Sequence, residues 1–113
     1  MRILDGTVSR AELATIAEDL FGDMVKAVAD VAEGKLAIDA ELHSDLEQLL
    51  LQNGSQQQNL WGINLYPDAD VEDFIEFDSL INIRPRQNNR SRDVESAETR
   101  DAIRKIVDKY IVK

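Results

Sequence analysis

The stretch from Phe74 to Pro85 constrains the fold more than any other part of the chain. Side chains on a β-strand point alternately to its two faces, so a strand over residues 74–84 would have one apolar face and one mixed, charged face. Pro85 lacks the N–H that a ladder needs and disfavours helix in the residue before it, so we expect the strand to end at Arg84. The core face would carry Ile75, Phe77, Ser79, Ile81 and Ile83, and the other face Phe74, Glu76, Asp78, Leu80, Asn82 and Arg84.

Two earlier stretches alternate in a similar way and predict a β-hairpin. Residues 24–31 and 35–43 flank the sequence Ala32-Glu33-Gly34, which is typical of a tight turn. Helix is the competing interpretation of 24–32, because Ala, Lys and Met favour helix. The clean alternation of 35–43 favours the hairpin. A third strand is expected over 59–66, where Gly62 suggests a bulge or a close approach by another group.

Three helices are expected around these strands. Ser9 with Glu12 forms a capping box for a helix that ends at Gly22, and Ser44 with Glu47 forms a second box for a helix that ends before Asn53. A final helix follows Ser96 and has a broad apolar stripe: Ala102, Ile103, Ile106, Val107, Tyr110 and Ile111. Residues 2–8 could form a short strand or an extended arm.

The elements together predict an α+β fold in a single domain over residues 1–113. The economical arrangement is a four-stranded, mostly antiparallel sheet with about three helices packed on one face. A chain of 113 residues with 43% hydrophobic and 31% charged residues is expected to form one compact core.

The charge and the composition exclude several classes of function. A formal net charge of −9 opposes attraction to nucleic acid or to an anionic membrane surface. The absence of cysteine excludes disulfides and thiolate metal sites. Because we find neither a leader-like segment nor a membrane-spanning apolar stretch, we expect a cytoplasmic protein.

An arginine-rich loop follows the strand expected over 74–84. Four of the thirteen basic residues fall between positions 84 and 92, interleaved with amides and a serine. Because guanidinium groups contact carboxylate or phosphate in a bidentate way, the loop is a reasonable anion cradle. The competing interpretation is that these arginines pair with the chain's own carboxylates or point into water. The candidate ligand-binding residues are Arg84, Asn89, Arg90 and Arg92, with Asn64 and Glu76 of the polar sheet face.

The polar faces of the later strands predict a second feature. If they lie together, a site-like mixture converges there: Asp39, Glu41, His43, Asn64, Tyr66, Glu76, Asp78, Asn82 and Arg84. The candidate catalytic residues are Glu41, His43 and Asp78, with His43 as a general base that one of the two carboxylates orients. A solvated outer sheet face has a similar pattern, and His43 could equally close the strand and cap the next helix. His43 is the sole histidine and the spacing fits no metal motif, so we predict neither a metal site nor a cofactor. A metal site of Glu41, His43 and Asp39 or Glu76 is the competing interpretation.

Four short segments resemble a family of small prokaryotic proteins known as a domain of unknown function. These segments are AELHSD at 40–45, NLWGINLYP at 59–67, FDSLINIRP at 77–85 and NRSR at 89–92. Glycine is usual in that family at the positions of Ala40 and Asn88. Asparagine at 88 would keep a left-handed turn, whereas alanine at 40 would not. The resemblance implies no activity, cofactor or catalytic residue.

Two hypotheses of function follow. In the first, the chain binds an anionic small molecule or a phosphate-bearing group at the arginine-rich loop, beside the polar sheet face. In the second, it is a homodimer or a partner-binding module without catalysis. A concave charged pocket would favour the first, and an exposed apolar face or an unpaired strand edge would favour the second.

Overall fold

The structure is a computed structural model that describes residues 1–113. Its strands and helices follow one another along the chain as β1 (Arg2–Ile3), β2 (Val8–Ser9), α1 (Arg10–Leu20), β3 (Val25–Asp30), β4 (Lys35–Ile38), α2 (His43–Gln52), β5 (Leu60–Leu65), β6 (Ile75–Glu76), α3 (Ala97–Tyr110) and β7 (Ile111–Val112). Four 3-10 turns lie between them: η1 (Gln57–Asn59), η2 (Val71–Asp73), η3 (Leu80–Asn82) and η4 (Pro85–Gln87).

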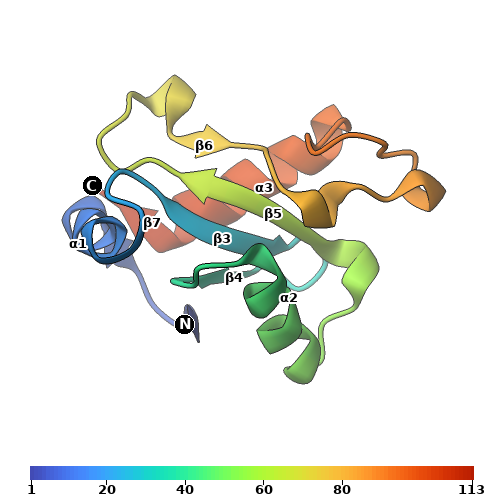
Figure 1. The fold of residues 1–113 in the computed structure, drawn as a ribbon, viewed down its shortest axis with the longest axis horizontal. Coiled ribbons are helices and arrows are strands. Elements are labelled where there is room, and N and C mark those ends of the chain that lie inside the picture. Colours follow the sequence, from blue (N-terminus) through green and yellow to red (C-terminus); the bar gives the residue numbers. More distant parts are fainter.

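The strands form one antiparallel sheet and one small parallel pair (Figure 1). The main sheet has the order β1-β4-β3-β5-β6, with β3 at its centre between β4 and β5. The pair joins β2 near the start of the chain to β7 at its end. The α+β class and the mostly antiparallel sheet are therefore confirmed, although the sheet has five strands rather than four. None of the helices combines the length and the apolar character that crossing a membrane requires.

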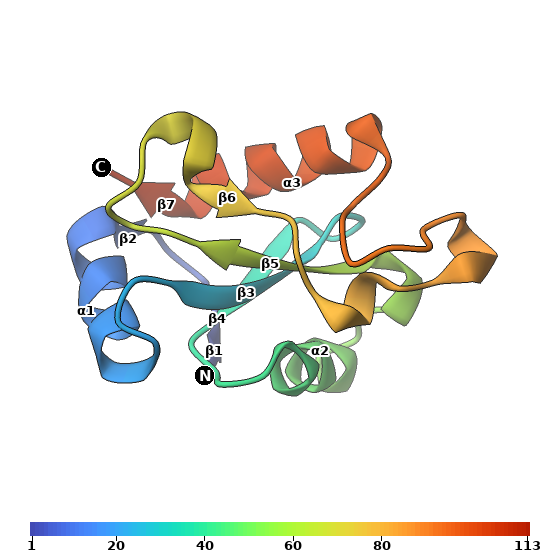
Figure 2. The same cartoon turned by 45° about the horizontal axis from the view of Figure 1, so that its top comes forward.

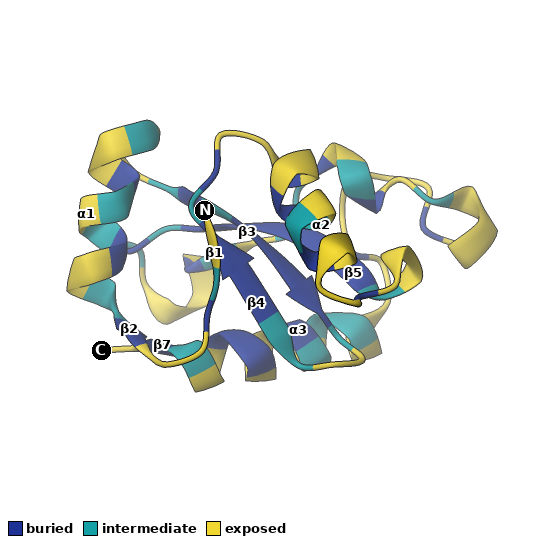
Figure 3. Cartoon of the chain, turned by 90° about the horizontal axis from the view of Figure 1, so that it is seen from below, coloured by how far each residue is buried: buried dark blue, intermediate teal, exposed yellow.

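The helices cover both faces of the sheet, which corrects the expectation of one covered face (Figure 2). Residues of α1 and α3 join the larger core with one set of strand side chains, including Leu36 and Ile63. Helix α2 packs on the opposite face, where Leu46 and Leu50 contact Val28 and Leu60. We call this opposite side the α2 face. Because α2 and the long α3 lie on either side, the central strands are buried on both faces (Figure 3).

Several expectations from local sequence signals are confirmed. Ser9 caps α1 by accepting the Glu12 N–H, and Ser96 caps α3 by accepting the Thr99 N–H. Strands β3 and β4 pair as the expected hairpin, with Ala29 opposite Leu36. Short-range signals succeed here because each one involves groups only a few residues apart.

The strand expected over 35–43 is shorter than predicted. β4 ends at Ile38, because Asp39 adopts a left-handed backbone with φ of 75°, and His43 is already the first residue of α2. The capping box expected from Ser44 and Glu47 is therefore wrong. The N-cap is Leu42, which has no side-chain acceptor to offer.

The strand expected over 74–84 is also wrong, because β6 contains only Ile75 and Glu76. Beyond it, the side chain of Asn82 replaces the ladder: its Oδ1 accepts the Gly62 N–H at 2.8 Å and its Nδ2 donates to the Gly62 carbonyl at 2.9 Å. Ser79 caps η3 by accepting the Ile81 N–H. Two buried polar side chains thus hold a segment whose alternation indicated a strand.

The same segment explains why residue 62 is a glycine. A close approach by another group was one of the two expectations for this position. A Cβ at this position would lie 2.6 Å from both Cβ and Oγ of Ser79. The approach, and not a bulge, is what the glycine permits, since Gly62 stays in register opposite Val28. Asn88 adopts the expected left-handed conformation with φ of 60°.

Candidate functional site

A polar row crosses the α2 face just beyond the start of α2. Lys26, Asn64 and Glu76 are successive cross-strand neighbours on β3, β5 and β6. The Asn64 amide donates to Oε1 of Glu76 at 2.8 Å and to the Asp78 carbonyl at 3.3 Å, and the Tyr66 hydroxyl donates to the same Oε1 at 3.0 Å. Burial, followed by the hydrogen bond to Glu76, raises the pKa of Tyr66 to about 12.

His43 lies beside this row at the first position of α2. Its ring is buried, and Nε2 donates to the Ile63 carbonyl at 2.8 Å. Because that carbonyl can only accept, the neutral ring carries its proton on Nε2 and leaves Nδ1 as an acceptor. Burial lowers the pKa of His43 below its usual value, against the opposing influence of the Ile63 carbonyl, and the positive charge of Lys26 lowers it further. At neutral pH the imidazole is therefore uncharged.

A pocket of about 250 Å³ opens between the start of α2 and η3. We call it the α2 pocket. It is lined by Lys26, Leu42, His43, Ser44, Ser79, Leu80, Ile81 and Arg92. The loop after β6 forms one wall because Asn82 fastens that loop to β5, and α2 forms the other.

The α2 pocket concentrates donors and positive charge. Arg92 binds Asp78 through Nε at 2.5 Å, which leaves its two terminal amino groups without a partner. Lys26 lies over the ring of Phe21 and has no carboxylate within ion-pair distance. The first two N–H groups of α2, on His43 and Ser44, have no acceptor, because Leu42 cannot cap the helix. These groups can all bind an anion.

Arg84, in contrast, is a structural residue. Its guanidinium stacks on the Trp61 ring with 4.1 Å to the centroid and donates to the carbonyls of Gln57, at 2.5 Å, and Leu60. Burial lowers the pKa of Arg84. The side chain covers the start of β5 and has few donors left for a ligand.

The rest of the arginine-rich loop is organised by Asn89 and Glu95. Asn89 is buried and donates to three carbonyls, those of Asn82, Ser91 and Asp93. Glu95 occupies the nest at the tip of the loop, where its carboxylate accepts the N–H groups of Arg90 and Ser91 and the Ser91 hydroxyl. The chain's own carboxylate thus fills the position where the loop would hold an anion, and the Ser91 hydroxyl holds the pKa of Glu95 below its usual value.

The structure brings together only part of the polar set expected on the sheet. His43, Asn64, Glu76, Asp78 and Arg92 lie in or beside the α2 pocket. Glu41 is exposed and makes no hydrogen bond, and Asp39 pairs with the N-terminal amine at 3.7 Å. Arg90 has an exposed side chain outside the pocket. No group of three or more potential ligands could hold a metal ion.

Sequence reasoning missed the contribution of Lys26, Ser44 and Ser79 to the pocket. Lys26 is a charged residue in a strand whose other residues are largely apolar. This contrast was the one sequence signal that could have pointed to Lys26 as a site residue. Ser44 was interpreted as a cap and Ser79 as a core-face residue of a strand. Their true positions depend on where α2 begins and on how the loop crosses β5.

Comparison with known proteins gives a family and nothing more specific. The model of a family described as a protein of unknown function (DUF5674) matches residues 2–110. No curated protein and no solved structure matches the chain.

Proposed function

The chain belongs to this family of unknown function, and we propose from the geometry of the site that it binds a small organic anion in the α2 pocket. One observation carries the proposal. In a chain of net charge −9, this pocket brings together two side-chain cations and a helix N-terminus without a side-chain cap.

The polar end of the ligand would lie between Arg92 and the start of α2. The terminal amino groups of Arg92 can hold a carboxylate or phosphate in a bidentate way, and the helix N-terminus adds a favourable partial charge. Asp78 holds the guanidinium by one edge, so the side chain is oriented before a ligand arrives. Little conformational entropy would then be lost on binding.

The rim of the pocket supports an organic rather than an inorganic anion. Leu42 and Leu80 line the pocket and are 56% and 67% exposed. A ligand with an apolar portion next to its charged group would cover both side chains, which contributes roughly 25 cal/mol per Å² of apolar surface removed from water.

His43 gives the pocket a proton acceptor. The neutral imidazole offers Nδ1 to a hydroxyl or an acidic proton of the ligand, and Asp78, rather than Glu41, is the nearby carboxylate that stabilises a charged ring. This would allow acid–base chemistry on a bound ligand, while binding itself requires only the cations and the helix terminus.

A thermal-shift screen of carboxylates and phosphate esters tests the proposal. A ligand at about 100 times its dissociation constant should stabilise the protein by roughly 2.7 kcal/mol. The Arg92→Ala variant should lose that shift. Arg90→Ala is the matched control, because Arg90 lies two residues away on the same loop but outside the pocket.

The pair of variants also separates the α2 pocket from the arginine-rich loop. Loss of the shift in Arg90→Ala with retention in Arg92→Ala would place the anion at the loop tip, against the proposal. If no small anion stabilises the parent protein, the proposal fails.

A further inference from the structure

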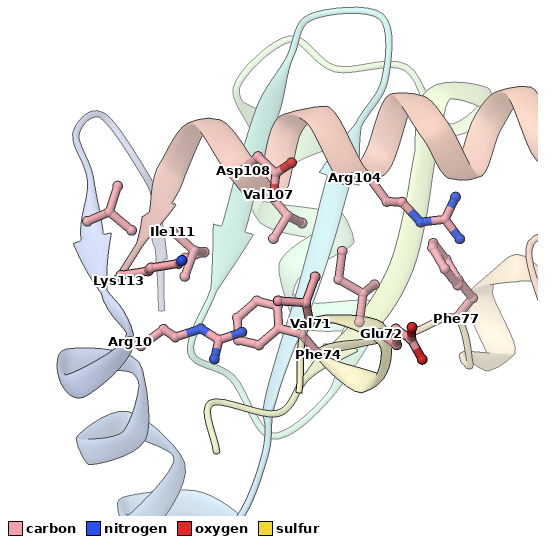
Figure 4. Close-up of a pocket in the computed structure, with 12 residues that line it drawn as sticks. Arg10, Val71, Glu72, Phe74, Phe77, Arg104, Val107, Asp108, Ile111 and Lys113 are labelled. Atoms are coloured by element: carbon pink, nitrogen blue, oxygen red, sulfur yellow. The ribbon is translucent and has the colours of Figure 1, made fainter. Parts of the chain in front are cut away.

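A groove of about 240 Å³ lies on the other side of the molecule from α2, between α3 and η2 (Figure 4). We call it the α3 groove. Its apolar side chains include Val71 of η2 itself, together with Phe74, Phe77, Val107 and Ile111, and the carboxylates of Glu72 and Asp108 also line it. Two arginines lie over its aromatic rings: Arg10 is 4.2 Å from the Phe74 centroid and Arg104 is 5.4 Å from that of Phe77.

Both arginines retain donors for a partner. Arg10 donates one Nη to the Ala69 carbonyl at 3.3 Å, and Arg104 donates one Nη to Asp101 at 2.8 Å. A guanidinium has five N–H donors, so each side chain can still hold a carboxylate at the rim of the groove.

The η2 turn, which forms one wall of the groove, also has chemistry complementary to the arginines. Val71 is 80% exposed, the most exposed large apolar side chain in the molecule. It is flanked by Asp70, Glu72 and Asp73, all exposed and none of them in an ion pair. An exposed valine between carboxylates would match an apolar groove whose rim carries arginines.

We propose that the α3 groove is the dimer interface of the protein. In the dimer, the Val71 turn of each copy lies in the α3 groove of the other copy. A two-fold interface uses the same patch on both subunits and must be self-complementary. This patch contains the exposed Val71, its acidic flanks and an apolar groove that carries Arg10 and Arg104 at its rim. The proposal does not depend on ligand binding in the α2 pocket.

The strand order is compatible with this contact. β6 is an edge strand of the main sheet, and β7 is one strand of the two-stranded parallel pair. Both strands contribute residues to the groove. A second copy would cover these short edges, which otherwise leave backbone groups without a strand partner. A stable dimer buries roughly 800 Å² per subunit, more than the groove alone provides, so we expect a reversible dimer.

Sedimentation velocity of the full chain from about 1 µM to about 1 mM tests the proposal. We expect a monomer at the low end and a dimer at the high end. Val71→Ser should weaken the dimer by at least about tenfold, since two valines leave the interface per dimer. Arg104→Glu should also weaken it.

Leu80→Ser is the matched control, because Leu80 is similarly exposed but lies at the α2 pocket. It should leave the dimer unchanged. Since Val71 is a surface residue of a short turn, its variant is expected to fold, which circular dichroism can verify. The proposal is overturned if the protein stays monomeric at about 1 mM. This holds also if the monomer binds an acidic peptide of another protein in the groove. A dimer that Val71→Ser leaves unchanged overturns it as well.

Discussion

Replacing Gly62 by alanine tests how the loop after β6 crosses β5. Gly62 is buried in the middle of β5, and an added Cβ would lie 2.6 Å from two atoms of Ser79 and 3.1 Å from Cγ1 of Ile81. Real Cβ atoms do not approach other atoms to 2.6 Å, so Ser79 has to move. The 3.1 Å contact involves the flexible side chain of Ile81, which can adjust.

Ser79 cannot move freely. It is 1% exposed, its N–H donates to the Arg92 carbonyl at 3.1 Å, and its Oγ caps η3. Overpacking a well-packed core costs about 1 to 3 kcal/mol, and we expect Gly62→Ala to fall at about 2 to 3 kcal/mol because the obstacle is held by hydrogen bonds. For a domain of this size the melting temperature should fall by roughly 10 °C.

A double-mutant cycle isolates the contact. Ser79→Gly removes both atoms that obstruct the new methyl group, whereas Ser79→Ala keeps the Cβ and is the matched control. Urea unfolding of the single and double variants should give a coupling energy of at least about 1 kcal/mol for Gly62→Ala with Ser79→Gly, and a much smaller one with Ser79→Ala.

Two results would refute this reasoning. One is a cost of Gly62→Ala below about 0.5 kcal/mol, the range expected of substitutions that disturb no packing. The other is an equal rescue by Ser79→Gly and Ser79→Ala. Because Ser79 also lines the α2 pocket, Gly62→Ala should in addition weaken any ligand bound there.

Two further predictions follow from buried polar side chains. Asn89→Ala should destabilise the protein by roughly 2 to 4 kcal/mol in urea unfolding, because three carbonyls lose a shared donor in the loop; a cost near zero would show that water replaces it. His43 should make the free energy of unfolding depend on pH. Because its pKa is lowered in the folded state, the unfolded chain binds the proton more readily. Stability is therefore lost as pH falls below about 6.5, with a slope of at most about 1.4 kcal/mol per pH unit. His43→Gln should remove this part of the slope between pH 7.5 and 5, and an unchanged slope would contradict the assignment.

Much of the fold could be predicted from the chain itself. Ser9 and Ser96 cap the helices that they were expected to cap, and the hairpin of β3 and β4 forms around Gly34. Each of these features depends on hydrogen bonds and burial between nearby residues, so a local pattern contains the necessary information.

The strand expected over 74–84 shows where local patterns fail. The alternation of that segment is real, but Asn82 binds both backbone groups of Gly62, 20 residues away, and Ser79 begins a 3-10 turn. A buried amide that replaces a strand ladder leaves no periodic signal, because its partner is distant in sequence. The exposure of Leu80 and Ile83 follows from the same turn.

For the candidate site, the sequence indicated which residues have suitable chemistry, whereas the tertiary structure decided where those residues lie. Composition and motif reasoning singled out His43, Asp78 and Arg92, whose chemistry is evident from residue type alone. Only the tertiary structure separates Arg92, which retains free donors at the start of α2, from Arg84, which stacks on Trp61.

The amino-acid sequence was therefore sufficient for the α+β class, the serine caps of α1 and α3 and the hairpin of β3 and β4. The tertiary structure decided which face each helix covers, where the loop after β6 lies, why residue 62 is a glycine, and that Arg92 rather than Arg84 brings unused donors to the α2 pocket. The physical reason is range: caps and turns are set by contacts between neighbours, whereas an arginine's partners are set by carbonyls and rings that only the folded chain brings to it.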